Sequence, residues 1–193
     1  MPAHDSMSPS PWVLRFAPLI AAGGRVLDLA CGSGRHARLL AERGHRVLAL
    51  DRDAAALERL AQSLDAAAAG RFEMLQADVE ADPWPWPVGE APFNGIVVTN
   101  YLHRPLFPAP CASLRPGGVL IYETFAIGNE QHGRPSNPDF LLARDELLER
   151  VAPDLSVLAF EQGLVQHPAP AVVQRICAAR TMNWSVLALP GGN

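Results

Sequence analysis

The sequence predicts an α/β protein in which a mostly parallel sheet lies between two layers of helices. Over the first 125 residues, short apolar runs alternate with segments whose apolar residues recur at helical spacing. Glycines bound several of these runs, as is typical of buried strands. The last two apolar runs have no long helical segment between them, which predicts an antiparallel hairpin at one edge of the sheet.

The individual elements follow from the positions of apolar residues and helix-ending glycines. Parallel strands are expected over residues 25–30, 46–50, 72–76, 93–99 and 119–124, and the two final strands over 155–160 and 172–180. Helices are expected near 12–20, over 35–43, 54–69 and 140–151, and in the part of 103–114 that follows Pro110. Prolines exclude regular structure from residues 82–89.

The composition favours a single domain over residues 1–193 and excludes several functions. The chain is 49% hydrophobic, which suffices for a buried core, and a flexible arm is expected over residues 1–10. A net charge of −4, without a long basic run, argues against nucleic acid as a partner. All 16 basic residues are arginines, which excludes Schiff-base chemistry and a P-loop lysine.

The cysteines and the apolar runs indicate the compartment. The three cysteines are widely separated and show no zinc-binding spacing, so we expect reduced thiols and no bound metal. No apolar run approaches the ~20 residues that span a bilayer, and residues 1–11 lack the pattern of a signal peptide. We therefore expect a soluble, cytoplasmic protein without a membrane partner.

A glycine-containing turn between the first strand and the first helix carries the main functional signal. It runs Asp28-Leu-Ala-Cys-Gly32-Ser-Gly34, and its glycines let a ligand approach the backbone. Gly32–Ala37 satisfies the dinucleotide pattern G-x-G-x-x-G/A, but S-adenosylmethionine can bind at the same kind of turn. A carboxylate at Asp28 would repel a pyrophosphate and attract a sulfonium, so electrostatics favours S-adenosylmethionine.

Several segments together resemble the class I S-adenosylmethionine-dependent methyltransferases over residues 23–125. Val26–Gly34 resembles motif I of that family. Other similar segments are Asp51 at the end of the second strand, Ala77-Asp-Val79, Phe93–Thr99 (with Asn94 where an aspartate is usual) and Leu114–Leu120. The remainder is similar, more weakly, to small-molecule methyltransferases of the tellurite-resistance (TehB-like) type.

The resemblance implies a Rossmann-like three-layer sandwich and a cofactor site. The implied sheet is mostly parallel and seven-stranded, with one antiparallel strand near the C-terminus inserted between two others. Asp51 would hold the ribose hydroxyls, and Asp78 with Val79 would contact adenine. The expected residues that bind S-adenosylmethionine are Asp28, Ala30, Gly32, Gly34, Asp51, Arg52, Asp78, Val79 and Asn100.

The acceptor side is expected at the carboxyl edge of the sheet, after the fourth and fifth strands. Tyr101 and His103 are candidate catalytic residues, His103 as a general base and Tyr101 over the methyl group. Both are also candidates for binding the acceptor, together with Arg104, Glu123, His132 and Arg134. The last two lie in a long loop, 125–138, that is either an active-site lid or an ordinary surface loop.

Several alternatives stay open on the sequence alone. His103 could be an exposed residue at a helix start, Asp28 could only cap the nearby loop, and Asp51 could only cap the following helix. Arg35 and His36 are expected to face solvent, whereas Cys31 and the Trp84-Pro-Trp86 pair are expected to pack. The preferred function is methyl transfer to a small molecule, with oxygen, nitrogen, sulfur or a metalloid oxyanion as acceptor atom. The rivals are an NAD(P)-binding oxidoreductase and a non-catalytic S-adenosylmethionine-binding protein.

Overall fold

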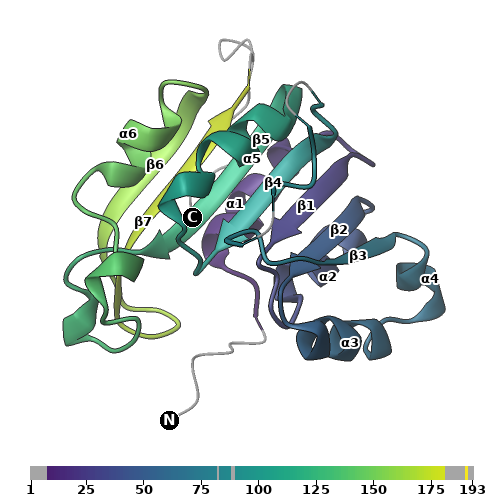
Figure 1. Ribbon diagram of the computed structural model, residues 1–193, viewed down its shortest axis with the longest axis horizontal. Helices are drawn as coiled ribbons and strands as arrows, with labels where there is room; N and C mark the ends of the chain where they lie inside the picture. Colours follow the sequence, from purple (N-terminus) through teal and green to yellow (C-terminus); the bar gives the residue numbers. More distant parts are fainter. Residues whose placement is uncertain (1–7, 82, 88–89, 181–189, 191–193) are drawn as a thin grey trace.

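A seven-stranded sheet organises the chain in the computed structural model, which describes residues 8–81, 83–87, 90–180 and 190 (Figure 1). The strand order is β3-β2-β1-β4-β5-β7-β6. The strands are β1 (Arg25–Leu29), β2 (Arg46–Asp51), β3 (Phe72–Gln76), β4 (Phe93–Thr99), β5 (Leu114–Phe125), β6 (Ser156–Val165) and β7 (Ala171–Ala179). Strands β3 and β4 have the bounds that the apolar runs predict.

Helices cover both faces of the sheet, as the sequence predicts (Figure 1). They are α1 (Pro11–Phe16), α2 (Arg35–Glu42), α3 (Ala54–Gln62), α4 (Ala66–Ala69), α5 (Pro108–Ser113) and α6 (Glu146–Val151), with short 3₁₀ turns at 17–19, 104–106, 129–131 and 138–140. Buried residues of α1, α2 and α3 pack on one face, and those of α5 and α6 pack on the other. Neighbouring residues of β1 point to opposite faces of the sheet: Val26 packs in the core beneath α1, α2 and α3, and Leu27 packs in the core beneath α5 and α6.

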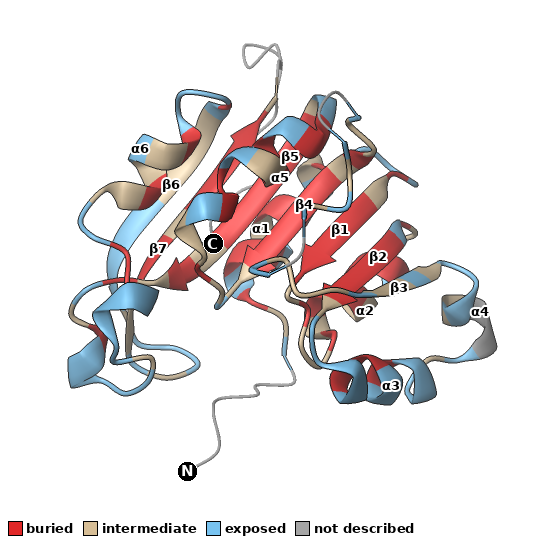
Figure 2. Ribbon diagram, viewed as in Figure 1, coloured by how far each residue is buried: buried red, intermediate tan, exposed pale blue. Residues whose placement is uncertain are grey.

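The connectivity confirms the sheet that the family resemblance implies. Strands β1 to β5 run parallel to one another, whereas β7 lies antiparallel between β5 and β6. The carboxyl ends of β1 to β5 therefore meet at one edge of the sheet, where ligands bind in open α/β folds. The strongest burial lies in the central strands, which Figure 2 shows as an almost continuous red band.

Three expected helices differ from the structure. The helix expected over 54–69 is split into α3 and α4, because Asp65 accepts a hydrogen bond from the Ala68 N–H and so begins a new helix. The helix expected over 140–151 begins only at Glu146. Before it, Phe140 ends a 3₁₀ turn, Leu141 is extended and Leu142 pairs with Ala126. Helix α5 also begins two residues before Pro110, at Pro108.

The N-terminal arm is anchored at its end. Residues 1–7 lie outside the described residues, but Ser10 is buried and its hydroxyl accepts a hydrogen bond from the Trp12 N–H. The same hydroxyl donates to Glu123 at 2.8 Å. Ser10 thus serves as the N-cap of α1 and ties the arm to β5, so the expected flexibility does not extend to this residue.

Candidate functional site: two adjoining hollows

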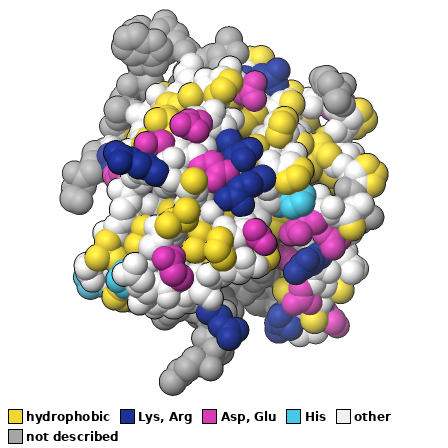
Figure 3. All heavy atoms as spheres, turned by 60° about the vertical axis from the view of Figure 1, so that its left-hand side comes forward, with side chains coloured by type: hydrophobic (Ala, Val, Ile, Leu, Met, Phe, Trp, Pro, Cys, Tyr) yellow, Lys and Arg dark blue, Asp and Glu magenta, His cyan; other side chains and the backbone are white. Residues whose placement is uncertain are grey.

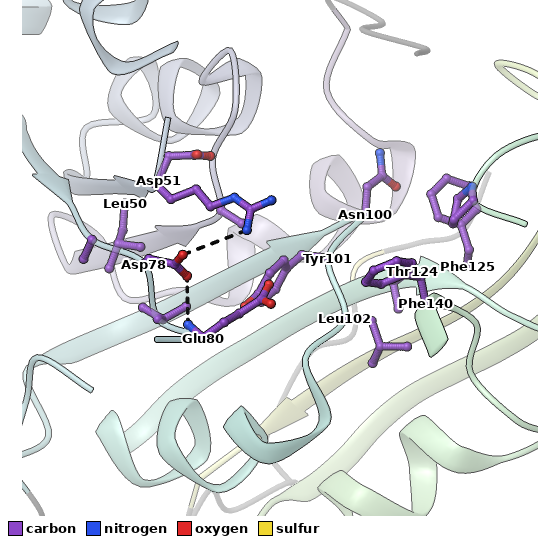
Figure 4. A pocket seen from close by; sticks show the side chains of 15 residues that line it. Leu50, Asp51, Asp78, Glu80, Asn100, Tyr101, Leu102, Thr124, Phe125 and Phe140 are labelled. Carbon is purple, nitrogen blue, oxygen red and sulfur yellow. Dashed lines mark hydrogen bonds and ion pairs between the residues drawn. The ribbon is translucent and has the colours of Figure 1, made fainter. Parts of the chain in front are cut away.

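A hollow of about 290 Å³ opens at the carboxyl ends of β1, β2 and β4. Six of the nine expected cofactor residues line it: Ala30, Asp51, Arg52, Asp78, Val79 and Asn100. Leu50, Leu102, Phe125 and Phe140 add apolar walls. In Figure 4, Asp51 and Asp78 lie on one side of the hollow, Phe125 and Phe140 lie on the other, and Tyr101 lies between them. A polar end and an apolar wall suit a nucleoside.

Asp51 links the hollow to the glycine turn. It is the last residue of β2, and its Oδ2 atom accepts a hydrogen bond from the Gly32 N–H at 2.7 Å. Its Oδ1 atom accepts from the Asp53 N–H at 2.9 Å. A carboxylate has about four lone-pair sites, so roughly two stay open for hydroxyl donors in the hollow. The helix cap that the sequence left as an alternative for Asp51 is supplied by Asp53.

The charges of this hollow are mainly negative. Asp51, Asp78 and Glu80 line it against a single basic residue, Arg52. Asp78 accepts a hydrogen bond from the Glu80 N–H at 3.1 Å and lies 4.0 Å from the guanidinium of Arg52. The excess of carboxylates favours a cationic ligand over a pyrophosphate.

Asp28 has a different environment from the one expected. It does not line the hollow and is 1% exposed, beneath the glycine turn. Burial raises its pKa to about 7, although a hydrogen bond from the Ala37 N–H and the charge of Arg35 oppose this. Its Oδ2 atom has no hydrogen-bond partner among the described residues. Because Gly34 offers no capping side chain at the start of α2, Asp28 takes over one capping bond there.

The glycines shape the turn without lining the hollow. Gly32 has φ +52°, and a Cβ there would have no neighbour within 4 Å. Gly34 has φ +74°, and a Cβ there would lie 2.5 Å from the Leu60 side chain. Gly34 thus allows α2 and α3 to pack closely, whereas Gly32 leaves open space above the backbone.

After β4 the chain turns sharply at Asn100, whose φ is +56°. Tyr101 and Leu102, which follow this turn, line the hollow, whereas His103 and Arg104 do not. Burial, followed by the nearby Glu80 carboxylate, raises the pKa of Tyr101 well above its usual value. The hydroxyl therefore stays protonated at neutral pH and cannot serve as a general base.

His103 and Arg104, expected on the acceptor side, line neither large hollow. The His103 Nδ1 atom lies 3.8 Å from the Glu80 carboxylate. Arg104 makes two bonds to Glu146, at 2.8 and 3.0 Å, and donates to the carbonyls of Asp139 and Leu141. Its guanidinium therefore fastens the segment before α6 and is not presented to a ligand.

A second hollow, of about 270 Å³, adjoins the first and shares Asn100 and Phe125 with it. Its walls come from the arm at 8–11, the loop at 129–134 and the turn between β6 and β7. Glu123, His132 and Arg134 line it, so three of the expected acceptor residues gather in one place. The loop 125–138 borders both hollows, since Pro135 lines the first.

The structure adds residues that the sequence did not single out. Asn129 is buried and holds the loop, because its amide donates to the Pro135 carbonyl and accepts from the Val172 N–H. Arg175 lies opposite both Glu123 and Glu161 on the strands beside β7. In the sequence, Arg175 stands out only as a charged residue within an apolar strand. Asn129 stands out only by its place in a long loop.

His36 is buried, contrary to the expectation of exposure. Its Nε2 atom accepts a hydrogen bond from the Ser10 N–H at 3.1 Å, and its Nδ1 atom lies 3.2 Å from the Thr99 hydroxyl. Burial, followed by the charge of Arg35, lowers the pKa of His36 to about 3. The ring is thus neutral, carries its proton on Nδ1, and fixes the arm above α2.

The aromatic pair and Cys31 have packing roles, as expected. The Trp84 indole donates to the Ser113 hydroxyl at 2.9 Å, and the ring of Trp86 packs edge-on against Phe93. Cys31 is buried within the core beside α2. None of the three lines either large hollow.

The described residues hold no group of three His, Cys, Asp or Glu side chains that could bind a metal ion, and none of their helices is long and apolar enough to cross a membrane. Figure 3 shows basic and acidic side chains intermingled on the face formed by β6, β7 and α6. The described part of that face therefore has no continuous basic surface of the kind that binds nucleic acid.

Comparisons with known proteins agree with this geometry. The model of a family described as "Methyltransferase domain" matches residues 26–118. The chain is 37% identical over 128 residues to the trans-aconitate 2-methyltransferase of Paracidovorax citrulli, covering 63% of this chain and 44% of that protein. It is 35% identical over 113 residues to the malonyl-[acyl-carrier protein] O-methyltransferase of Serratia marcescens, covering 56% and 41%. The chain thus spans less than half of either relative.

Solved structures show the same fold. TehB from Haemophilus influenzae superposes with a TM-score of 0.72 at 19% identity, covering 92% of this chain and 64% of that one. The antiparallel β7 between β5 and β6 also separates this sheet from the order 3-2-1-4-5-6 of dinucleotide-binding domains. Residues 26–118 thus match a methyltransferase domain, and the sheet has the fold of solved structures of S-adenosylmethionine-dependent methyltransferases. The matched stretch extends from β1 into the first residues of β5.

Proposed function

We propose that the protein transfers a methyl group from S-adenosylmethionine to a small-molecule acceptor. The observation that carries the proposal is the meeting of two hollows at Asn100 and Phe125. The first has the acidic and apolar lining that suits a cationic nucleoside. The second has the volume of a small metabolite site. The curated relatives are named for methyl transfer to trans-aconitate, a malonyl group and protein isoaspartate, so they share the activity but not the acceptor.

The first hollow fits the cofactor chemically. When bound, S-adenosylmethionine supplies an electrophilic methyl group on a positively charged sulfur. Asp51 has lone pairs left for the ribose hydroxyls, and Asp78 with Val79 would contact adenine at the next strand end. The open space above Gly32 leaves room for a ligand close to the backbone.

The residues of the chain contribute mainly by placing the two reactants. Methyl transfer needs the acceptor atom in line with the methyl group and the leaving sulfur, and it needs water excluded. Phe125 and Phe140 supply apolar walls on the side of the hollow away from Asp51. Asn100 and Phe125 face both hollows and would lie nearest to the transferred group.

The test is formation of S-adenosylhomocysteine when the purified protein, S-adenosylmethionine and a metabolite extract are incubated together. We expect formation by the wild type and a loss of about tenfold or more in kcat/KM for Asp51→Ala. Asp154→Ala is the matched control, because Asp154 is exposed and lines neither hollow. Binding without formation of S-adenosylhomocysteine would favour the non-catalytic rival, and binding of NAD(P) alone would favour an oxidoreductase.

A further inference from the structure

The second hollow is basic, although the protein as a whole is acidic. Among the described residues, Arg35, Arg134 and Arg175 line it against one carboxylate, Glu123. The net charge of the chain is −4. The lining of the first hollow has the opposite balance, with three carboxylates and one arginine. The two adjoining hollows therefore favour ligands of opposite charge.

The negative charge of Glu123 in the second hollow is already paired within the protein. The Oε2 atom of Glu123 lies 3.4 Å from the Arg175 guanidinium, and its Oε1 atom accepts a hydrogen bond from the Ser10 hydroxyl. The Arg175 guanidinium also lies 3.4 Å from a carboxylate oxygen of Glu161. Within the described part of the chain, Arg134 makes no ion pair, and its side chain comes from the loop that borders both hollows. The surplus positive charge in the lining thus includes Arg134.

Among the described residues, Glu123, His132 and His167 line only the second hollow and are not shared with the first. Asn100 and Phe125, the residues shared by both hollows, have side chains that do not titrate. Tyr101 stays protonated at neutral pH, and His103 lies outside both hollows. An acceptor that must lose a proton during the reaction would have to pass it to a group away from the two shared residues, whereas an acceptor that is already ionised needs no base.

We propose that the methyl acceptor is a small anion, a carboxylate or an oxyanion of similar size, which Arg134 and the basic lining hold in the second hollow. This inference rests on the proposed methyl transfer. A lone pair of the anionic oxygen forms the new O–CH₃ bond while the C–S bond breaks, and the electron pair of that bond stays on sulfur. The negative charge of the acceptor and the positive charge of the sulfonium disappear together, and no proton moves.

The experiment titrates the protein saturated with S-adenosylhomocysteine and follows the heat of binding. The probes are succinate and inorganic phosphate, with succinamide as a neutral analogue of similar shape. The variants are Arg134→Ala, Arg134→Lys and the control Arg144→Ala, whose side chain is 89% exposed and pairs with the adjacent Asp145. Arg134→Lys separates loss of charge from loss of shape, since lysine keeps the charge.

We expect succinate or phosphate to bind more tightly than succinamide. The anion that binds better shows whether the hollow prefers carboxylates or tetrahedral oxyanions. Arg134→Ala should weaken anion binding by about tenfold or more, because it removes a charged hydrogen-bond donor. Arg134→Lys should retain most of the affinity and Arg144→Ala all of it. Equal binding of succinamide, no binding of either anion, or an unchanged affinity in Arg134→Ala overturns the inference. If S-adenosylhomocysteine itself does not bind, the proposed function fails with it.

Discussion

Asp28 is the residue whose environment departs most from what its place in the glycine turn suggests. A turn residue beside a cofactor would be partly exposed, yet Asp28 is buried and bonded to the Ala37 N–H. Burial costs the charged form of a carboxylate more than the neutral form, so the pKa rises. The negative charges of the first hollow come instead from residues at and after the ends of β2 and β3.

The pH dependence of stability tests this environment. Because the folded pKa of Asp28 is about 7 and its ordinary value is 3.8, the folded state holds a proton that the unfolded state loses between these values. The free energy of unfolding should therefore fall as pH rises from about 4 to 7, by roughly 2–4 kcal/mol from this group. Asp28→Asn should remove that fall, measured by urea unfolding at pH 5 and pH 8. An equal pH dependence in both proteins would contradict the buried, protonated carboxyl.

Residues at strand ends were predictable from the sequence, and residues brought in by tertiary packing were not. Asp51, Asp78 and Asn100 follow apolar strands, so the parallel sheet alone places them at one edge. His103 and Arg104 follow the same strand end but line neither large hollow, and their roles stay predictions. Arg175 reaches the second hollow only because β7 is inserted beside β5, which no local pattern reveals.

At the scale of elements, Arg104 connects the turn after β4 to the start of α6. Burial alone would raise the pKa of Glu146, but bonds from Arg104, the Ala143 N–H and Arg150 outweigh it and lower the pKa to about 2. The resulting stability is present above pH 4.5 and is lost as pH falls toward 2. Arg104 is thus expected to matter for stability more than for acceptor binding.

Arg104→Ala should reduce the free energy of unfolding at pH 7 by about 2 kcal/mol, because a partly buried carboxylate loses its bidentate partner. The loss of stability between pH 5 and pH 3 should also become shallower. Chemical unfolding of the variant, beside Arg144→Ala as an exposed control, measures both effects. A variant as stable as the wild type at pH 7 would contradict the structural role.

The close packing of α2 against α3 at Gly34 can be tested by substituting glycines. Gly34 and Gly44 both have positive φ, but only at Gly34 would a Cβ collide with the buried Leu60 side chain. Gly44→Ala should therefore cost about 1 kcal/mol of stability from backbone strain, and Gly34→Ala about 2–4 kcal/mol. Thermal or urea unfolding of the pair compares them directly. Equal losses would show that Leu60 moves aside without cost.

Element boundaries were predictable where apolar runs are sharply bounded. Strands β3 and β4 match their expected ranges, since charged, proline or glycine residues flank them. The expected helix over 140–151 was too long, because the helical spacing of its apolar residues hides an extended start at Leu141 and Leu142. Pairing of Leu142 with Ala126 outweighs the local helix propensity there.

At the scale of the whole molecule, the insertion of β7 beside β5 gives the two adjoining hollows opposite charges. The acidic hollow lies over β1, β2 and β4, and the basic hollow lies toward β5 and the β6–β7 turn. The arm closes the second hollow, because Ser10 is bonded to both His36 and Glu123. A cation and an anion can thus be held side by side in one small protein.

Equilibrium binding to the acidic hollow tests the central claim most directly. Titration calorimetry should show that the wild type binds S-adenosylmethionine and S-adenosylhomocysteine and does not bind NAD⁺ or NADP⁺. Asp51→Ala should bind both nucleosides at least about tenfold more weakly, since each charged hydrogen bond contributes about 1.5–3 kcal/mol. Tight binding of a nicotinamide dinucleotide, or undiminished affinity of Asp51→Ala for S-adenosylhomocysteine, would contradict the assignment of this hollow.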